Sequence, residues 1–298
     1  IGDRLTQNGF GSVNNFNHGG VCGMTGVMAN VRTHPTTNHK RMYADIDHCE
    51  CLIIWGTEPM TANKGPSWLA PRLSVARERG MKLYVVDPRQ GRSASKADVW
   101  LPIRPGTDVA LMMTWIRYII ENKLYDEDFC KRWTNLPYLI DTDTKKMLRA
   151  YEVGLGEADA EDAEKTFVVW DQKTNSAKAL PWPYDEALDP AFFGTYEIDG
   201  VEYPTAFTLL QERVDEWTLE KGCEVCCLEK DQVEKAIRIY AENAPSGLVL
   251  GVATDMSPQS AQGTEGACIL EFLLGNVEKP GALLQRFPDP PNKVDLAL

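Results

Sequence analysis

Four short polar segments carry the residue types that could bind a ligand, and each directly follows an apolar run. Asp87 can accept hydrogen bonds from a ribose or a base, and Asp108 opens a predicted helix, where it either caps that helix or accepts a ligand N–H. Gly56 allows the backbone to approach a ligand closely. The candidate binding residues of the four segments are Gly56, Thr57, Glu58, Asp87, Pro88, Arg89, Gly106, Thr107, Asp108, Gly251 and Thr254.

A cluster of cysteines near residue 225 contains a CxxC pair, Cys223 and Cys226, which suggests a metal or redox site. Zinc and iron–sulfur sites need a second pair or histidines at matching spacing. Cys49 and Cys51 lie far away in the sequence, and no spacing links them to this cluster. We therefore interpret Cys226 and Cys227 as small apolar residues directly before a helix.

The apolar runs before the polar segments are typical of buried parallel strands. Helical patterns lie between these runs, and the alternation indicates βαβ units. The predicted fold class is therefore α/β, with a doubly wound, mostly parallel, Rossmann-like sheet whose carboxyl edge carries the polar segments. The expected strands cover 51–55, 82–86, 99–103 and 248–250, and the expected helices cover 24–33, 66–79, 108–120, 206–217, 230–243 and a stretch after 251 that ends near 275.

Residues 151–203 differ from the rest of the chain, because they are acidic and aromatic and contain turn pairs such as Asp189-Pro190. Short β segments are expected at 168–170 and 196–198. We interpret this stretch as a small antiparallel β insertion and not as a separate core. Residues 1–298 are then expected to form one α/β domain of a larger protein.

The overall charge limits the partners of this chain. Its 298 residues include 31 Lys and Arg against 43 Asp and Glu, a net charge of −12, which argues against a nucleic-acid binder because such proteins need a basic surface. No apolar run approaches the roughly 20 residues of a membrane span. The chain begins at Ile1 and not at Met, so we expect it to be a piece of a longer protein.

The usual nucleotide-binding fingerprints are missing. After the strand at 51–55 the sequence has Gly56 and then no glycine until Gly65, so the G-x-G-x-x-G pattern of nicotinamide dehydrogenases is absent. A phosphate loop of the G-x-x-x-x-G-K-[ST] type is absent as well. The predicted architecture nevertheless suits a nucleotide, so a different nucleotide-bearing ligand is required.

Several motifs together resemble one family. IIWGTEP, LYVVDPR and ADVWLPIRPGTD within 52–108, and LLGNVEKPGAL at 273–283, closely resemble the cofactor-binding domain of the molybdopterin oxidoreductases of the dimethyl sulfoxide reductase family, which carry bis-(molybdopterin guanine dinucleotide). The resemblance covers nearly the whole chain in order. FVVWD at 167–171 and GTYEIDG at 194–200 are most similar to the branch that holds acetylene hydratase, transhydroxylase and catechol dehydroxylase.

The resemblance implies that the polar segments hold one guanine dinucleotide arm of the cofactor. The carboxylates of Asp87 and Asp108 can accept paired N–H bonds from the guanine edge, and a helix N-terminus can take the pyrophosphate. Glu58 departs from the family, whose members often have Asn at this position. A carboxylate there would be repelled by a pyrophosphate.

The segment GVCGMTG at 20–26 aligns with the active-site segment of the family. Cys22 is therefore the expected protein ligand of molybdenum or tungsten and an expected catalytic residue; the alternative is a small buried residue at a helix start. Some members carry a catalytic histidine directly after the ligand, but this chain has Gly23 there, so His18 is the nearest candidate base. Arg286 is a further candidate for the pterin side of the cleft.

The family implies a fragment of a molybdenum or tungsten oxidoreductase catalytic subunit that supports oxygen or hydroxyl transfer. The alternative is a non-catalytic structural subunit that keeps the fold without the cofactor; the joint presence of Cys22, Asp87 and Asp108 favours the enzyme. A 4Fe–4S cluster is expected in a part of the parent protein that precedes this chain. The expected partners are the remaining domains of the subunit, a small-molecule substrate and an electron-transfer iron–sulfur subunit, in a bacterial or archaeal cell.

Overall fold

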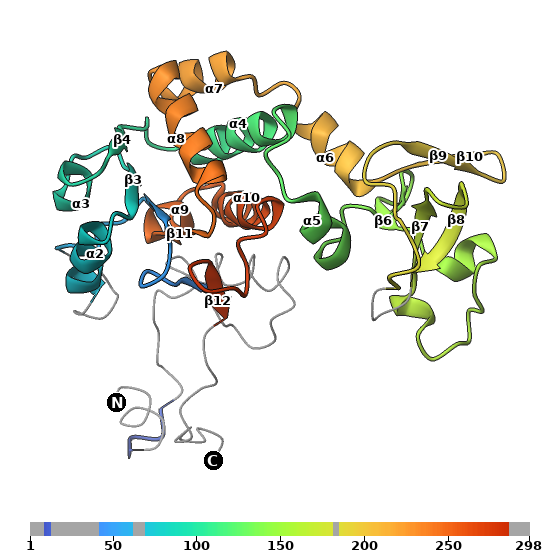
Figure 1. The fold of residues 1–298 in the computed structure, drawn as a ribbon. Coiled ribbons are helices and arrows are strands. Elements are labelled where there is room, and N and C mark those ends of the chain that lie inside the picture. The colour runs from blue at the N-terminus through green and yellow to red at the C-terminus, as the bar shows by residue number, and fades with distance from the viewer. Residues whose placement is uncertain (1–8, 13–41, 62–68, 181–184, 286–298) are drawn as a thin grey trace. The chain divides into compact units, whose positions relative to one another are not determined.

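The computed structural model describes residues 9–12, 42–61, 69–180 and 185–285 of the chain (Figure 1). The chain divides into two compact units. Unit 1 contains the residues up to Val109 together with Asn243–Cys268 and Val277 onward, and unit 2 contains Ala110–Glu242 and Ile269–Asn276.

The centre of unit 1 is a four-stranded sheet in the order β11-β2-β3-β4, in which every neighbouring pair is parallel. This sheet, with helices between its strands, confirms the predicted α/β class and its mostly parallel sheet. Each strand begins and ends close to where the apolar runs of the sequence predict. The strand bounds are β2 (Cys51–Trp55), β3 (Lys82–Val86), β4 (Val99–Leu101) and β11 (Ser246–Leu250).

The sheet is apolar on both faces, and its side chains are buried on both. Alternate side chains of β2 and β3, such as Leu52 and Leu83, pack with Leu73 of helix α2 (Leu69–Glu78) and Ala94 of helix α3 (Arg92–Ser95) in one core. Trp55 points to the other face and is fully buried. Figure 1 shows α2 and α3 beside β3 and β4.

Unit 1 also contains elements that the sequence did not predict. Strand β1 (Met42–Ala44) pairs with β12 (Leu283–Gln285) in an antiparallel ribbon. Two helices follow β11 in place of the single predicted one, namely α9 (Val252–Asp255) and α10 (Ser260–Leu273). The loop between them holds Pro258, which lacks the backbone N–H that a continuous helix would need there.

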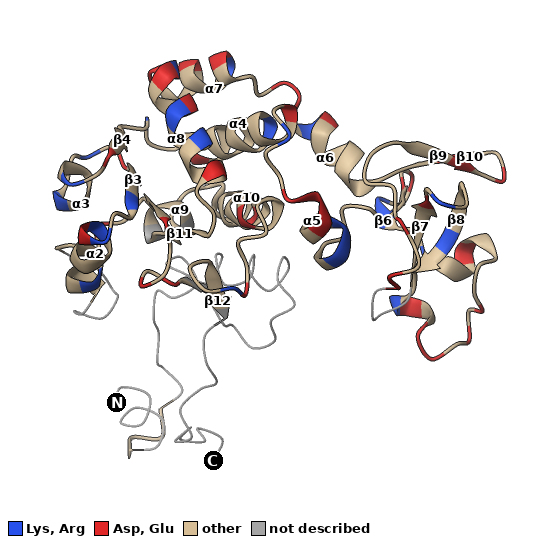
Figure 2. Cartoon of the chain, in the orientation of Figure 1, with Lys and Arg blue, Asp and Glu red and all other residues tan. Residues whose placement is uncertain are grey.

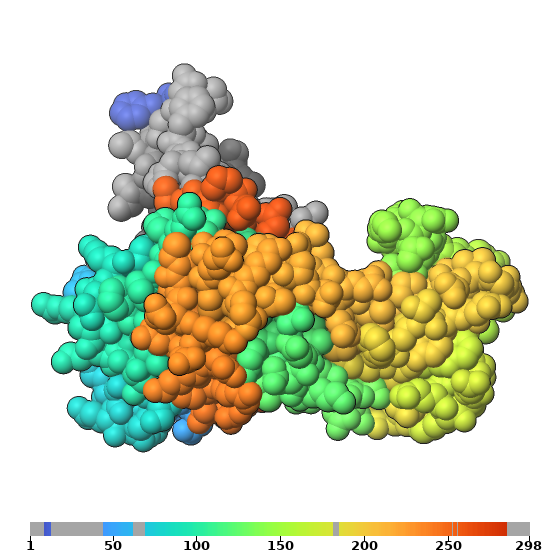
Figure 3. Space-filling view, turned by 90° about the horizontal axis from the view of Figure 1, so that it is seen from above, coloured from blue at the N-terminus to red at the C-terminus, as the bar shows by residue number. Residues whose placement is uncertain are grey.

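Unit 2 is a group of helices joined to small antiparallel sheets. Trp115 of α4 contacts Tyr240 of α8, with ring centroids 5.8 Å apart. A Cβ on Gly222 would lie 1.9 Å from Thr114 Oγ1, so α7 and α4 approach as closely as they do because this residue is glycine. In the view of Figure 3, side chains of α7 and α8 (orange) form the visible surface of this part. The helices are α4 (Asp108–Glu121), α5 (Glu127–Trp133), α6 (Ala206–Val214), α7 (Leu219–Cys226) and α8 (Lys230–Glu242).

The β segments predicted at 168–170 and 196–198 are confirmed in two antiparallel hairpins of unit 2, and a third hairpin at 140–147 was not predicted; all three lie beside α6 in Figure 1. Their shared core contains Leu139, Leu148, Ala150 and Val168. The boundaries of the insertion at 151 and 203 stay a prediction. The hairpins are β5 (Ile140–Asp141) with β6 (Lys146–Met147), β7 (Phe167–Asp171) with β8 (Ser176–Leu180), and β9 (Thr195–Ile198) with β10 (Val201–Pro204), and the short helices η3 (Ala150–Val153) and η4 (Ala163–Lys165) connect β6 to β7.

Most of the net charge of the chain lies in residues 151–203. This stretch has 13 acidic and 3 basic residues, a net charge of −10, against −12 for all 298 residues. Figure 2 shows acidic positions, in red, along the connections of these hairpins. Because these residues belong to unit 2, the sheet of unit 1 carries little of the negative charge.

The cysteine cluster lies at the C-terminal end of α7. The sequence had predicted only that these residues directly precede a helix, and not that they end one. Cys223 and Cys226 belong to α7 and are buried, so the interpretation as a small apolar residue holds for Cys226. It was wrong for Cys227, which is exposed and forms the C-cap of α7 in the left-handed region, at φ 56°. Among the helices that the structure describes, none combines the length and the apolar character needed to cross a bilayer.

A buried carboxyl stands in α10. Glu271 is 1% exposed, and neither of its carboxyl oxygens has a hydrogen-bond partner among the described residues. Burial raises the pKa of Glu271 well above its ordinary value, and the nearby phenol of Tyr240 offsets only part of this rise. The folded protein therefore binds a proton here more tightly than the unfolded chain does.

This proton makes stability fall with rising pH. Above the ordinary carboxyl pKa the unfolded chain releases the proton while the folded protein keeps it, so up to about 1.4 kcal/mol of stability is lost per pH unit until the folded pKa is reached. We expect Glu271→Gln to remove this loss. The unfolding midpoint of the variant, relative to that of the wild type, should therefore rise as the pH increases from 5 to 8. Glu212→Gln, at an exposed position of α6, is the control. Parallel pH profiles for wild type and Glu271→Gln would contradict the assignment.

Candidate functional site

The four parallel strands end in one row. Leu250 pairs with Trp55, Trp55 pairs with Val86, and Val86 pairs with Leu101. The ladder continues one residue further, because Gly56 N donates to Val86 O at 2.9 Å and the N–H of residue 251 donates to Trp55 O at 2.7 Å. The four segments that follow these strand ends therefore leave the sheet at the same edge, which we call the carboxyl edge.

Two glycines allow the segments after β2 and β11 to touch. Gly56 has a φ of +64°, a conformation that side chains disfavour. A Cβ on Gly251 would lie 2.1 Å from Gly56 O and 2.4 Å from Thr57 Cβ. Both glycines thus serve the contact between two loops. Their first role is to bring the backbones together, whether or not a ligand lies above them.

Glu58 is used by the protein itself. Its carboxylate accepts hydrogen bonds from the backbone N–H groups of Ser93, at 3.1 Å, and Met60, at 3.2 Å, and from the Ser93 hydroxyl. A Cβ on Gly91 would lie 1.9 Å from Glu58 Oε2, so the glycine leaves room for the carboxylate. The acid that departs from the family pattern therefore joins the loop after β2 to the first turn of α3.

The turn after β3 is closed by a hydrogen bond within its own residues, and the side chain of its arginine is exposed. Asp87 Oδ1 accepts from Arg89 N at 2.8 Å, which closes the turn. The Asp87 carbonyl accepts from Trp100 Nε1 of β4 at 2.8 Å. Pro88 and Arg89 are exposed. Asp87 is half-buried, and its Oδ2 has no donor among the described residues.

The loop before α4 ends in a carboxylate that contacts the centre of the sheet. Thr107 Oγ1 donates to Arg104 O at 2.7 Å, and Gly106 has a φ of +82°, so the chain turns sharply into the helix. Asp108 is the first residue of α4 and half-buried. Its Oδ1 accepts from Trp55 Nε1 at 2.7 Å. Trp55 is the only donor to this carboxylate in the described part of the chain.

Thr254 points back into the protein. Its hydroxyl donates to Gly251 O at 2.8 Å, and the residue is 1% exposed. This bond closes the first turn of α9 directly behind the carboxyl edge. Thr254 therefore supports the loop after β11 and offers no hydroxyl to the solvent side.

Three arginines lie at the carboxyl edge and have no partner among the residues that the structure describes. Arg89 follows β3, Arg92 is the first residue of α3, and Arg104 follows β4. All three are exposed, and within the described ranges none of their guanidinium groups forms a hydrogen bond or an ion pair. Guanidinium groups suit phosphates, which they can bind through two parallel hydrogen bonds.

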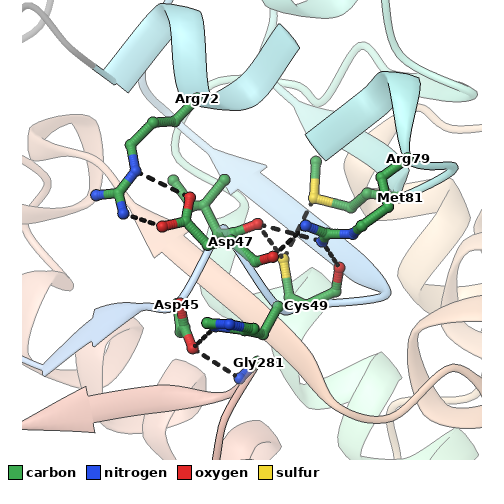
Figure 4. Close-up of polar contacts among 9 residues, drawn as sticks. Asp45, Asp47, Cys49, Arg72, Arg79, Met81 and Gly281 are labelled. Atoms are coloured by element: carbon green, nitrogen blue, oxygen red, sulfur yellow. Dashed lines mark hydrogen bonds and ion pairs between the residues drawn. The ribbon is translucent and has the colours of Figure 1, made fainter. Parts of the chain in front are cut away.

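The other described arginines of unit 1 lie towards the opposite, amino edge of the sheet, and the protein itself holds them. Arg72 pairs with Asp47, with Nε 2.9 Å from Oδ1, and Arg79 donates to the carbonyl of Asp47 and to two neighbouring carbonyls (Figure 4). Arg77 pairs with Asp98. Within the described part of unit 1, the arginines of the amino edge thus have protein partners and those of the carboxyl edge do not.

The turn at the amino edge is a structural network. Figure 4 shows Asp45 accepting from the backbone of Gly281, at 3.0 Å, and the thiol of Cys49 directed at the sulfur of Met81, at 3.2 Å. Burial raises the pKa of the Cys49 thiol to about 12, although Arg79 opposes the rise. A thiol that stays protonated does not act as a metal ligand at neutral pH. This cysteine therefore belongs to the packing.

The expected metal ligand and base are not among the residues that the structure describes. Cys22, His18 and Arg286 fall outside the described residues, as does the helix expected at 24–33. Within the described ranges, no three His, Cys, Asp or Glu side chains gather in a way that could hold a metal ion. The metal-ligand role of Cys22 and the catalytic role of His18 stay predictions.

Two residues of this edge were not predicted from the sequence. Arg92 and Arg104 were not among the expected binding residues, although Arg104 lies inside one of the polar segments. A signal was available, because basic residues recur after the second and third strands of an acidic chain. Their lack of ion-pair partners, which distinguishes them, needs the three-dimensional structure.

In open α/β proteins, ligands bind beyond the carboxyl ends of the parallel strands, which is where this sheet carries its exposed arginines and half-buried aspartates. The family model for molybdopterin oxidoreductases matches residues 5–286, nearly the whole chain, and the chain belongs to this family. The resemblance seen in the sequence is thereby confirmed.

Individual relatives agree with the family. A selenate reductase of Mesobacillus selenatarsenatis is 27% identical over 313 residues, covering 94% of this chain and 28% of that protein. A perchlorate reductase of Dechloromonas aromatica is 28% identical over 277 residues, 82% of this chain and 29% of that protein. The solved structure of acetylene hydratase from Pelobacter acetylenicus shares the fold, with a TM-score of 0.58 and 24% identity over 95% of this chain and 28% of that one. The chain thus spans about a quarter of the length of these relatives.

The loop contact at the carboxyl edge predicts a large difference between two glycine substitutions. Gly251→Ala would place a Cβ against the backbone of Gly56, which cannot rotate away, so we expect a loss of about 3 kcal/mol of unfolding free energy. Gly263→Ala, in α10, would meet nothing closer than 3.8 Å, and we expect it to be neutral or to gain up to about 1 kcal/mol through helix propensity. Denaturant unfolding of both variants checks this. Equal effects would mean that the two loops do not touch.

Proposed function

We propose that this chain is the part of a molybdenum or tungsten oxidoreductase catalytic subunit that binds one guanine dinucleotide arm of the molybdopterin cofactor. The carboxyl edge would hold the nucleotide, with Arg89, Arg92 and Arg104 facing phosphate oxygens. The N-terminus of α4 would add its backbone N–H groups to this anion site. Asp108 would accept hydrogen bonds from the guanine edge.

The observation that carries the proposal is the division of the arginines in unit 1. Arginines that have protein partners at one edge and none at the other, as far as the described residues go, are the arrangement expected for an anionic ligand. An acceptor is also available for the base of the nucleotide, since no described residue donates a hydrogen bond to Asp108 Oδ2. Glu58, which could repel a phosphate, has its carboxylate turned to the first turn of α3. The residues present therefore fit a dinucleotide.

Cys22 would supply a thiolate to the metal, and His18 would be the nearest base. When bound, the cofactor would supply a metal that changes oxidation state or acts as a Lewis acid while an oxygen or hydroxyl group is gained or lost. The contribution of the described residues is to bind and orient the nucleotide. Gly56 and Gly251 keep the two loops together beneath it.

The remaining parts of the parent protein would complete the enzyme. A second guanine dinucleotide arm and a 4Fe–4S cluster would be held by domains outside this chain, and an electron-transfer iron–sulfur subunit would exchange electrons with it. Residues 1–298 would form one cofactor domain with an insertion at 151–203. The charge distribution supports this arrangement, because the acidic stretch belongs to unit 2 and not to the unit that carries the proposed phosphate site.

Arginine substitutions test the nucleotide site. We expect Arg104→Ala in the full-length protein to weaken binding of GDP, the nucleotide part of the cofactor, roughly tenfold, equivalent to about 1.4 kcal/mol, because a charge-assisted bond to phosphate is lost. The difference should shrink as ionic strength rises. Arg72→Ala removes an exposed arginine of α2 that already has a partner, and should leave GDP affinity unchanged. Calorimetry measures both, and equal effects would rule out a phosphate site at the carboxyl edge.

Cofactor content tests the proposed enzyme against the non-catalytic alternative. We expect the purified full-length protein to contain molybdenum or tungsten and to release guanine nucleotide on acid treatment. Asp108→Ala should lower both contents severalfold, because the base would lose its charged acceptor. Elemental analysis and chromatography of the released nucleotide give the two values. Folded protein with neither metal nor nucleotide would favour a structural subunit.

A further inference from the structure

We propose that Trp55 is a positioning residue that holds the Asp108 carboxylate toward the ligand, so that the pair Trp55–Asp108 reads guanine. This proposal rests on the function proposed above. It assigns a role to a strand residue that is fully buried, including its only polar side-chain group, the indole N–H.

The indole is fixed by its place in the sheet. Trp55 is the last residue of β2, a central strand that pairs on both sides, and it is fully buried. Its Nε1 donates to Asp108 Oδ1 at 2.7 Å. A side chain packed in this way has one available orientation, so the position of the N–H is set before any ligand binds.

The carboxylate contacts a side chain outside its own helix. Asp108 is the first residue inside α4, whereas the side chains that cap α5, α6 and α7 belong to the residues directly before those helices, Asp126, Thr205 and Thr218. Among the described residues the Asp108 carboxylate accepts from Trp55, far away in sequence, and from no N–H of its own first turn. The indole is thus the contact that sets the orientation of this carboxylate.

The remaining acceptor sites suit guanine. Oδ2 has no donor among the described residues, and Oδ1 keeps a second lone pair. Guanine presents two adjacent N–H groups, at N1 and N2, that can pair with both oxygens of one carboxylate. Hypoxanthine lacks the N2 amine, and adenine presents an acceptor at N1 that would face the negative charge. A fixed carboxylate therefore distinguishes these bases more sharply than a mobile one.

A structural explanation has to be separated from this one. A buried indole N–H needs an acceptor, and Asp108 could serve only to satisfy Trp55. Trp100 provides the comparison, because its indole donates to the backbone carbonyl of Asp87 at the same edge, at 2.8 Å. Replacing either tryptophan by phenylalanine removes one indole hydrogen bond. Only the change at Trp55 frees the Asp108 carboxylate.

The experiment measures GDP and IDP affinities of the cofactor-free full-length protein by calorimetry. We expect Trp55→Phe to weaken GDP binding five- to tenfold and IDP binding less, so that the preference for GDP narrows. Trp100→Phe should leave the ratio of the two affinities unchanged. In an Asp108→Asn background, Trp55→Phe should cause no further loss. Equal losses for GDP and IDP, or the same loss with and without the Asp108 carboxylate, would overturn the positioning role.

The outcomes separate the two proposals. If Asp108→Asn binds GDP as tightly as the wild type does, the guanine assignment is wrong, and the positioning role falls with it. If Asp108→Asn weakens binding and Trp55→Phe does not, only the positioning role is wrong. Should Trp55→Phe fail to fold, protein labelled with ¹⁵N-tryptophan serves instead. The indole N–H resonance of Trp55 is identified as the one that moves in the Asp108→Asn variant. This resonance should shift when GDP is added and stay in place when ADP is added. The absence of a shift with GDP overturns the proposal.

Discussion

The parallel pairing of β2 with β3 on one side and β11 on the other is the constraint on which the candidate site depends. Because the strands end in one row, the segments after them leave the sheet at one level, although they come from residues 56–61, 87–91, 102–107 and 251–259. A slip of register would separate Gly56 from Gly251 and would carry Trp55 away from Asp108. Hydrophobic burial on both faces of the sheet holds this register.

The distribution of charge follows from the same arrangement. Among the described residues, the carboxyl edge has arginines without partners, whereas the arginines of the amino edge are bound by its own carboxylates and carbonyls. The net charge of the chain gives no indication of this polarity, because residues 151–203 account for most of it. An acidic protein can therefore carry exposed arginines together at one edge of its sheet.

The sheet and the edge at which the polar segments gather could be predicted from the sequence, because buried strands appear as continuous apolar runs such as CLIIW and KLYVV. Short helices such as α5 and α7 were missed, since their stability comes from packing and not from a long periodic pattern. The β1–β12 ribbon was missed because its strands are very short and far apart in the chain.

Individual side-chain roles were harder to predict than the sheet. Glu58 was expected near a pyrophosphate, yet its partner is Ser93, and Asp108 has its partner in Trp55. Neither pairing has a local sequence signal, because each joins residues from different loops or strands. The loops could be assigned to a binding edge from spacing alone. Which oxygen faces the protein and which faces outward depends on tertiary contacts.

The pairing of β2 with β11 also has a consequence for synthesis of the protein. Residues 51–55 pair with 246–250, and the whole of residues 110–242 of unit 2 is made between them. During translation the side of β2 that pairs with β11 therefore has no partner strand until residues 246–250 have been made. The unpaired strand consists of five residues that are all buried in the folded protein. The arrival of β11 both completes the binding edge and covers a strand that would otherwise associate with other chains. Unit 2 thus sets the interval during which the nascent protein is exposed to aggregation.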